Sequence, residues 1–468
     1  MLTRLEVKGF KNLADLTVEF GPFTCIAGAN GVGKSNIFDA IQFLSLLADL
    51  PLMEAAEAVR GTRDERTGDP RDLLWRGPSQ KTMRFAAEMI VPPRVEDDFG
   101  QSVKPSISFL RYELEIGYSD PTQLDRRGRL VLMSESLKHI NLGEAPAHLR
   151  FPLSAKEFRS NVVFGRRSGV AFISTRKEGN DRVITVHQDG GSRGQPRRAS
   201  ATRAPATVVS TITVADDPTV LAARREMQSW RRLALEPTAL RTADRFTDPR
   251  IMSSDGSHLP ATLYRIAQAS DNGSHPDDVL ARVASRLSEL TGVSVKQLEI
   301  DADDTRELLT LRLVERSGVD IPARSLSEGT LRFLALCVLL EDPEFGGVVC
   351  MEEPENGIHP ANIKAMLDLL QDLAVDPDEA PGPDNPVRQV IVNTHSPVVV
   401  QVINPRDLLF ASGRPIEFED GSIHSALELR PMRGSWRAEA KDARPIGKAD
   451  LIPYLTTPAE QQLSLANS

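Results

Sequence analysis

Residues 28–35 read Gly-Ala-Asn-Gly-Val-Gly-Lys-Ser, and this stretch decides the fold. It matches the pattern Gly-x-x-x-x-Gly-Lys-Ser, in which backbone N–H groups at a helix start surround a phosphate chain. A strand pattern at Phe23 to Ala27 precedes it, and helically spaced apolar residues follow from Asn36 to Leu50. Because a strand and a helix flank the loop, a plain glycine turn is the weaker interpretation. The spacing also disfavours a dinucleotide fold, whose fingerprint is Gly-x-Gly-x-x-Gly.

The residue types inside this loop point to a nucleoside triphosphate held with magnesium. Gly28, Gly31 and Gly33 lack a Cβ and let the backbone approach a phosphate closely. We expect Lys34 to reach the β- and γ-phosphates and Ser35 to ligate Mg²⁺.

A pair of carboxylates ends an apolar strand in the second half of the chain, where Val348 to Met351 lead into Glu352 and Glu353. We expect Glu352 to hold Mg²⁺, directly or through water. Glu353 is one residue further on and points elsewhere, so it is expected to orient or deprotonate the attacking water. Two solvated acids at a strand end are the weaker alternative. Glu355 is equally well explained as a surface charge.

Residues 325–329, Ser-Leu-Ser-Glu-Gly, open an apolar helix. Ser325 and Glu328 fit a capping box, and a plain cap is one interpretation. Ser327 and Gly329 also place a hydroxyl and a bare backbone at a helix N-terminus, which is an anion site. Since the chain already has a phosphate loop, this second site is predicted to receive a γ-phosphate bound by another chain.

A histidine, His395, ends another apolar strand that starts at Ile391. We expect it to donate to the γ-phosphate; a purely structural histidine is the alternative.

The composition limits the classes of protein to which this chain can belong. The chain has 468 residues, 40% hydrophobic and 26% charged, which is ordinary for a globular protein with two or three domains. A net charge of −9 argues against a general nucleic-acid binder. No apolar run is long enough to span a bilayer, and the N-terminus alternates like a strand rather than a signal peptide. Three cysteines without a spacing pattern favour reduced thiols and a cytoplasmic location.

The order of the motifs predicts a split domain, because the phosphate loop and the carboxylates lie far apart in sequence and must share one site. The expected parts are residues 1–144 and 293–430 as the two halves of the domain, 145–292 as an inserted lid of mixed strands and helices, and 431–468 as a tail. Helical patterns are expected at 218–233, 259–269 and 276–290. Arginines from Arg159 to Arg203 either contact a polyanion or belong to a solvated loop.

Together these motifs resemble the ABC-type ATPases of the structural-maintenance-of-chromosomes (SMC) and RecF branch. The resemblance extends to small bacterial AAA-family ATPases related to the ATPase half of the overcoming-lysogenisation-defect (OLD) nucleases. It covers residues 1–50 and 320–400, with motifs at 326–333, 352–360 and 394–397 and a weaker element at 254–259. It implies an α/β fold, an ABC-type (P-loop) ATPase head with a mixed sheet, split by a large α+β insertion.

The resemblance also assigns roles to individual residues. It implies catalysis by Glu353 and His395, Mg²⁺ binding by Ser35, Glu352 and a metal-sensing Gln80, and ATP binding by Lys11, Asn12, Asn30, Gly31, Gly33, Lys34, Ser35 and Asn36. Ser327 and Gly329 would act on the nucleotide of a second subunit, in a head-to-tail homodimer formed with ATP. Three departures matter: Glu352 stands where most ABC proteins have Asp, Glu328 stands where transporters have Gly, and no long heptad stretch exists.

The function predicted from these features is an ATP-hydrolysing dimeric switch that acts in DNA repair or defence against phage, with DNA or a separate effector protein as partner. An ATPase subunit of a membrane transporter is the alternative, disfavoured by the split domain. A stand-alone nuclease is disfavoured because the tail has no carboxylate cluster suggestive of a nuclease.

Overall fold

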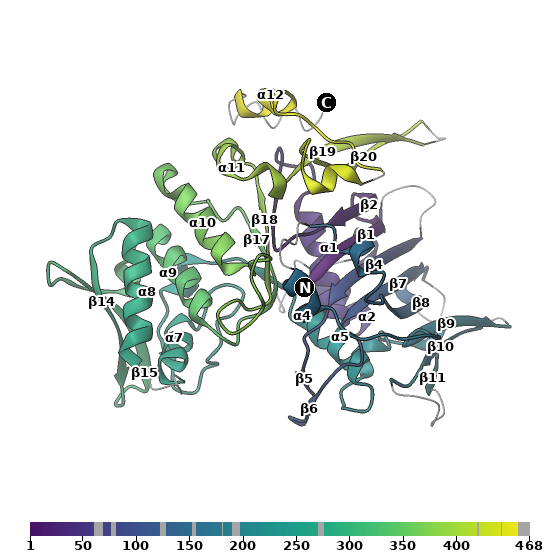
Figure 1. Ribbon diagram of the computed structural model, residues 1–468, viewed down its shortest axis with the longest axis horizontal. Coiled ribbons are helices and arrows are strands. Elements are labelled where there is room, and N and C mark those ends of the chain that lie inside the picture. The colour runs from purple at the N-terminus through teal and green to yellow at the C-terminus, as the bar shows by residue number, and fades with distance from the viewer. Residues whose placement is uncertain are drawn as a thin grey trace. The chain divides into compact units, whose positions relative to one another are not determined.

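The structure is a computed structural model that describes residues 1–59, 69–75, 81–121, 128–151, 156–179, 181–189, 197–269, 276–418, 421–440 and 442–456. The chain divides into two compact units (Figure 1). Unit 1 comprises Met1–Arg231, Asp376–Pro381 and Asn404–Ser468, and unit 2 comprises Arg232–Val375 and Gly382–Ile403. This division follows spatial contacts, so the boundaries expected for an inserted segment at 145 and 293 stay predictions.

An antiparallel sheet forms the larger part of unit 1. Its strands, in spatial order, are β11 (Arg197–Ser200), β10 (Asp181–Val186), β9 (Ile173–Glu178), β8 (Arg129–His139), β7 (Phe109–Ser119), β4 (Thr82–Ile90), β1 (Leu2–Phe10) and β2 (Leu13–Glu19). In β1 the side chains of Leu5 and Val7 are fully buried, while Lys8 is exposed. This alternation confirms the strand expected at the N-terminus, because successive side chains of a strand point to opposite faces.

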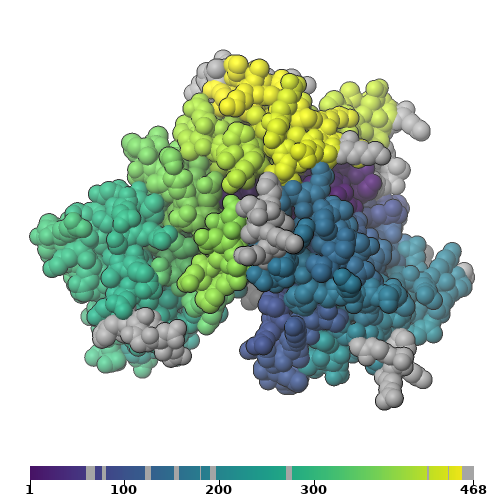
Figure 2. Space-filling model, viewed as in Figure 1, coloured from purple at the N-terminus to yellow at the C-terminus, as the bar shows by residue number. Residues whose placement is uncertain are grey.

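A second group of strands in unit 1 combines parallel and antiparallel pairing. β3 (Phe23–Ala27) runs parallel to β19 (Leu408–Glu417), which pairs antiparallel with β20 (Ile423–Pro431). The short strands β5 (Val95–Glu96) and β6 (Ser102–Val103) form a separate pair. The helices are α1 (Ser35–Leu47), α2 (Leu52–Ala58), α3 (Ala145–His148), α4 (Lys156–Val162), α5 (Pro218–Gln228) and α12 (Ile452–Thr456). The segment from β19 to α12 carries the yellow-green to yellow surface in Figure 2.

A buried arginine, Arg437, connects the C-terminal segment of unit 1 to the region of strands β2 and β3 through hydrogen bonds. Its guanidinium donates to the carbonyl oxygens of Glu19 and Arg406 and to the hydroxyl of Thr24, each at 2.8 Å. Burial lowers the pKa of Arg437 to about 10. Arg437, together with Met432, Ile446 and Leu451, is therefore part of the core of this unit, although the sequence around these residues has little periodic pattern.

Glu135 on β8 has a buried carboxylate, and the hydrogen bonds that it accepts come from residues of unit 1. It accepts from the backbone N–H groups of Val208 at 2.6 Å and Val209 at 2.8 Å, and from the hydroxyl of Tyr112 at 3.1 Å. Burial raises the pKa of Glu135 to about 7.

Unit 2 contains the second pair of motif-bearing strands. β17 (Gly347–Glu352) and β18 (Arg388–Thr394) run parallel, and β12 (Arg231–Leu233) is the neighbour of β17. A separate sheet holds β13 (Asp244–Arg245), β15 (Leu308–Glu315) and β14 (Val295–Asp303), with β16 (Asp320–Pro322) paired to β15. The helices are α6 (Pro237–Leu240), α7 (Leu259–Gln268), α8 (Pro276–Thr291), α9 (Glu328–Glu341), α10 (Ile363–Leu373) and α11 (Pro397–Val402).

The helix that follows Ser327 lies in the interior of unit 2. Leu331 and Leu334 to Leu336 of α9 are almost completely buried, and α9 lies beside α8 (Figure 1). A helix that is apolar around most of its circumference is stable only when other elements surround it.

The expected fold class is confirmed: helices combine with mixed parallel and antiparallel strands in an α/β arrangement. One element differs, because the helical pattern expected over 218–233 ends at Gln228 and the chain continues as β12. Among the described helices, none has the length and apolarity needed to cross a bilayer.

Candidate functional site

The phosphate loop of unit 1 joins a fully buried strand, β3, to α1 and requires glycine at three positions. Gly31 and Gly33 have φ values of +82° and +93°, in the left-handed region that favours glycine. At Gly28 an added Cβ would lie 2.4 Å from the carbonyl oxygen of Ala411. The glycine spacing noted in the sequence is therefore dictated by the backbone path.

Lys34, the last residue before α1, is buried and turned back over the loop. Its Nζ donates to the carbonyl oxygens of Gly28 and Ala29, both at 2.8 Å. Only 6% of Lys34 is exposed, so this cation is held where the loop curves around it. A positive charge enclosed by a backbone turn at a helix N-terminus is suited to an anionic ligand.

The hairpin turn between β1 and β2 supports the loop from the side. Asn12 donates through Nδ2 to the carbonyl oxygen of Val32 at 2.8 Å and accepts through Oδ1 from Asn36 at 2.7 Å. Lys11, with φ +46°, forms an ion pair with the fully buried Asp39 at 2.7 Å. The structure thus brings Asn12 and Asn36 together at the loop, whereas sequence reasoning missed Asp39 as the partner of Lys11.

The carboxylate pair of unit 2 lies at the carboxyl end of β17. Glu353 has a left-handed backbone, φ +46°, and its N–H donates to the carbonyl oxygen of Asn393 at 3.0 Å. Its Oε1 lies 2.7 Å from Nδ1 of His395, the residue after β18. Because β17 and β18 are parallel, their carboxyl ends share one edge, and the two predicted catalytic side chains meet there.

Glu352 forms an ion pair with Arg232, whose Nη2 lies 2.9 Å from Oε1 of the carboxylate. Sequence reasoning did not find this partner, because Arg232 is more than a hundred residues away and lies within the helical pattern that was expected over 218–233.

Glu355 is not a surface charge, which corrects that interpretation. It is 9% exposed, and its carboxylate accepts from the hydroxyl of Thr394. Burial raises the pKa of Glu355. Thr394 is a site-supporting residue that the Thr-His-Ser-Pro motif contained but that sequence reasoning did not assign.

Ser327 is the residue that caps α9, so the expected capping box of Ser325 with Glu328 is wrong. Its Oγ accepts from the N–H of Thr330 at 3.2 Å. Ser325 belongs instead to a 3₁₀ turn, and the helix begins only at Glu328. Ser327 is exposed, and Arg241 donates to the preceding carbonyl oxygen, that of Leu326, at 3.2 Å. An added Cβ at Gly329 would lie 3.5 Å from the carbonyl oxygen of Gly357.

Two family models match the segments that hold these motifs. The model described as "RecF/RecN/SMC N terminal domain" matches residues 1–50, which include the phosphate loop. The model described as "AAA domain, putative AbiEii toxin, Type IV TA system" matches residues 216–401, which include Ser327, the carboxylate pair and His395. These matches support a likeness, over the two segments, to ABC-type ATPases of the SMC/RecF branch that are related to the OLD proteins.

Individual proteins match this chain over shorter stretches. The DNA replication and repair protein RecF of Pediococcus pentosaceus is 38% identical over 77 residues, 16% of this chain and 17% of RecF. The OLD nuclease of Thermus scotoductus is 48% identical over 44 residues, 9% of this chain and 8% of that nuclease. The matches thus span less than a fifth of either relative. A solved Smc head bound to the C-winged helix domain of ScpA aligns with 92% of this chain and 98% of its own, at 16% identity and a TM-score of 0.46.

The oxygen donors that were expected to bind Mg²⁺ in this chain are chemically suited to it. Mg²⁺ prefers carboxylate, hydroxyl and phosphate oxygens. The Ser35 hydroxyl stands at the first position of α1, and the Glu352 carboxylate is ionically paired to Arg232. Gln80, the third expected ligand, lies outside the described residues.

Part of the basic segment of this chain is engaged within its own unit. Arg167 lies 4.0 Å over the ring of Phe172 and donates to three backbone carbonyl oxygens. Arg197 pairs with Asp217 and Arg198 with Glu178. These three arginines are therefore part of a structured surface.

Proposed function

We propose that this chain binds ATP with Mg²⁺ and hydrolyses it to ADP and phosphate, and that the reaction works as a conformational switch. The observation that carries the proposal is the 2.7 Å contact between Glu353 and His395 at the end of two parallel strands. A carboxylate and an imidazole in hydrogen-bond contact form a pair able to accept and hold a proton.

Nucleotide binding is assigned to the phosphate loop of unit 1. The ammonium of Lys34 now contacts two carbonyl oxygens, and phosphate oxygens would offer it charged acceptors in their place. Such charge-assisted hydrogen bonds are roughly twice as strong as neutral ones. Asn30 and Gly31 at the exposed tip, with Gly33, Ser35 and Asn36, complete the proposed phosphate contacts. Lys11 and Asn12 act on the nucleotide through the loop that Asn12 supports.

Ser35 and Glu352 are proposed to hold Mg²⁺, with Gln80 as the metal-sensing residue. The metal would supply charge neutralisation of the phosphates. The ion pair with Arg232 restrains the direction of the Glu352 carboxylate.

Hydrolysis is assigned to unit 2. Glu353 accepts a proton from the attacking water, which adds to the γ-phosphorus as the bond to the β-phosphate oxygen breaks. His395 contacts Glu353 through Nδ1, which leaves Nε2 for the γ-phosphate. The strained backbone of Glu353 is anchored by its hydrogen bond to Asn393, which fixes the direction of the carboxylate.

The active form is proposed to be an ATP-dependent, head-to-tail homodimer. Ser327 is exposed at the N-terminus of a buried helix, where the helix dipole favours an anion. Its proposed role, with Gly329, is to contact the γ-phosphate held by the phosphate loop of the second subunit.

A DNA-related role fits the names of the relatives, one a replication and repair protein and one a nuclease. The matched model for residues 216–401 refers to a toxin–antitoxin system, which supports defence against phage with a separate effector protein. A cytoplasmic location and the absence of a membrane partner belong to the same proposal. The transporter alternative has no supporting observation among the described residues.

The test is the Glu353→Gln variant, which keeps the shape of the side chain and removes its basicity. We expect ATP binding near the wild-type level and a loss of turnover of about 10²-fold or more. Asp304→Asn is the matched control, since Asp304 is an exposed acid of the same unit. Wild-type turnover in Glu353→Gln, with turnover lost in Glu352→Gln, would show that the two roles are reversed.

A further inference from the structure

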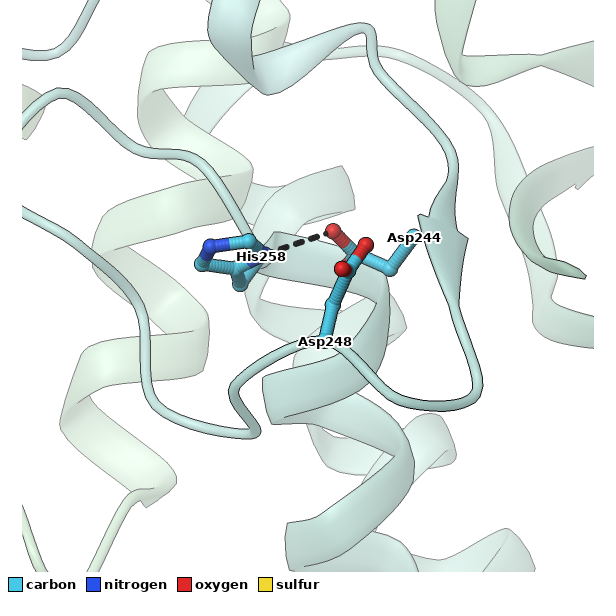
Figure 3. A group of neighbouring side chains, drawn as sticks. All are labelled: Asp244, Asp248 and His258. Atoms are coloured by element: carbon cyan, nitrogen blue, oxygen red, sulfur yellow. Dashed lines mark hydrogen bonds and ion pairs between the residues drawn. The ribbon is translucent and has the colours of Figure 1, made fainter.

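Three side chains of unit 2, Asp244, Asp248 and His258, bring two carboxylates and an imidazole to one point (Figure 3). One potential ligand atom from each lies within 4.8 Å of the other two. Nδ1 of His258 is 2.9 Å from Oδ1 of Asp244, and the carboxylate of Asp248 lies beside that pair.

The backbone around this cluster is fixed by contacts of its own. Asp244 belongs to β13, which pairs with β15, and its Oδ2 accepts from the N–H of Ala261 in the first turn of α7. Asp248 accepts from the N–H of Arg245 at 2.7 Å. Gly256, two residues before His258, has φ +91° and no room for a Cβ, which would lie 2.6 Å from Leu240. The three side chains are thus presented by a preformed turn, which lowers the cost of binding an ion.

The charge of the cluster is not balanced by arginine or lysine. Among the described residues, neither Asp244 nor Asp248 forms an ion pair with a guanidinium or an ammonium group. The side chain of Asp244 is 3% exposed, so water screens its charge poorly. Two carboxylates at this separation repel each other unless a cation lies between them.

We propose that Asp244, Asp248 and His258 form a binding site for a divalent transition-metal ion such as Mn²⁺ or Zn²⁺. Metal–ligand bonds of about 2.0 to 2.2 Å that meet at the right angles of octahedral coordination, the geometry of Mn²⁺, separate adjacent ligand atoms by about 3.0 Å. The 2.9 Å between Nδ1 and Oδ1 matches that separation. A set of one imidazole and two carboxylates suits Mn²⁺ and Zn²⁺ better than Mg²⁺, which prefers oxygen ligands alone.

The position of the site suggests what the ion does. Arg241 stands three residues before Asp244 and donates to the carbonyl oxygen of Leu326, next to Ser327. A bound ion joins the segment around Asp244 to the start of α7 and restrains the stretch that holds Leu326. None of the three ligands is assigned to ATP binding or hydrolysis, so metal binding at this site can be measured without nucleotide.

The experiment titrates the whole chain with MnCl₂ alone, without nucleotide, and follows free Mn²⁺ by electron paramagnetic resonance. We expect one bound Mn²⁺ per chain, displaced by Zn²⁺. His258→Asn and Asp248→Asn should each weaken Mn²⁺ binding by about 10-fold or more, because each removes a ligand. Asparagine tolerates the left-handed backbone of His258, φ +67°, and at 248 keeps an acceptor for Arg245, so both variants suit the fold.

His148→Asn is the matched control, because His148 contacts a carboxylate, that of Glu88, at the same 2.9 Å but has no second carboxylate in a three-residue cluster. This variant should bind Mn²⁺ as the wild type does. Unchanged Mn²⁺ binding in both His258→Asn and Asp248→Asn overturns the proposal. No Mn²⁺ bound by the wild type also overturns it and leaves a histidine–aspartate pair that only supports the turn; a lower Tm of His258→Asn would then measure that role.

Discussion

Replacing Gly33 with alanine should destabilise unit 1 through one identifiable side chain. The new Cβ would lie 2.1 Å from Nδ2 of Asn12, so the amide of Asn12 has to move away. It then loses its hydrogen bonds to Val32 and Asn36, worth about 1 kcal/mol each. The positive φ, which strains an alanine backbone, costs a further sum of about 1–2 kcal/mol. The expected loss in the free energy of unfolding is therefore about 3–4 kcal/mol in total. Gly31→Ala is the control, since its Cβ meets nothing within 4 Å and carries only the backbone cost of about 1–2 kcal/mol.

Urea unfolding followed by tryptophan fluorescence measures this difference in the right unit, because Trp75, Trp230 and Trp436 all belong to unit 1. With a slope of about 3 kcal/mol/M, the two alanine variants should differ in midpoint by roughly 0.7 M. The double variant Asn12→Ala, Gly33→Ala should cost less than the sum of its single changes, because the clash no longer exists. Equal destabilisation by Gly31→Ala and Gly33→Ala, or strict additivity in the double variant, would refute the reasoning.

Three further predictions concern ATP, assembly and pH. Lys34→Ala should abolish ATP binding in calorimetry, because it removes the buried cation of the loop; unchanged affinity would contradict the phosphate-loop assignment. Ser327→Arg should leave ATP binding to the monomer intact and block turnover. Mixing it with Lys34→Ala should partly restore turnover, because one composite site of a mixed dimer carries neither defect; mixed dimers that form and stay inactive would argue against completion in trans. Burial raises the pKa of Glu135 from 4.5 to about 7, so this group lowers the free energy of unfolding by about 3 kcal/mol as pH rises through that window. Glu135→Gln should flatten this pH dependence in urea unfolding, and an unchanged slope would locate the titration elsewhere.

The features that sequence predicted best are those determined by a few consecutive residues. The loop from Gly28 to Lys34 needs glycine where the backbone has positive φ or approaches Ala411, and such requirements are local. Glu353 and His395 were each predicted from a strand end, and the parallel pairing of β17 with β18 brings the two side chains into contact. The residue that caps α9 was predicted two positions too early. Ser325 and Ser327 both have the chemistry of a helix cap, and only the observed start of the helix distinguishes them.

The partners that sequence did not predict join residues without a shared local pattern. Ion pairs join Arg232 to Glu352 and Asp39 to Lys11, and a contact at ion-pair distance joins Asp244 to His258. In each case, other turns or strands lie between the two residues in the sequence. Ion pairs of this kind leave no periodic pattern in the sequence, because a charged residue fits the polar pattern of its element whichever partner it contacts. The buried Glu355 was misjudged for a related reason: a charged residue after a turn is usually exposed, and only the contact with Thr394 shows otherwise.

The anchoring of Arg437 on Glu19 and Thr24 has a consequence for how the chain acquires its structure during synthesis. Strand β3, which leads into the phosphate loop, pairs with residues 408–410. The carbonyl oxygen of Glu19 accepts its hydrogen bond from Arg437, which is synthesised later still. Unit 2, by contrast, has all its residues once position 403 has left the ribosome. The phosphate loop is thus synthesised early and stabilised late, so the nascent chain should complete the surroundings of this loop only after all residues of unit 2 have been synthesised.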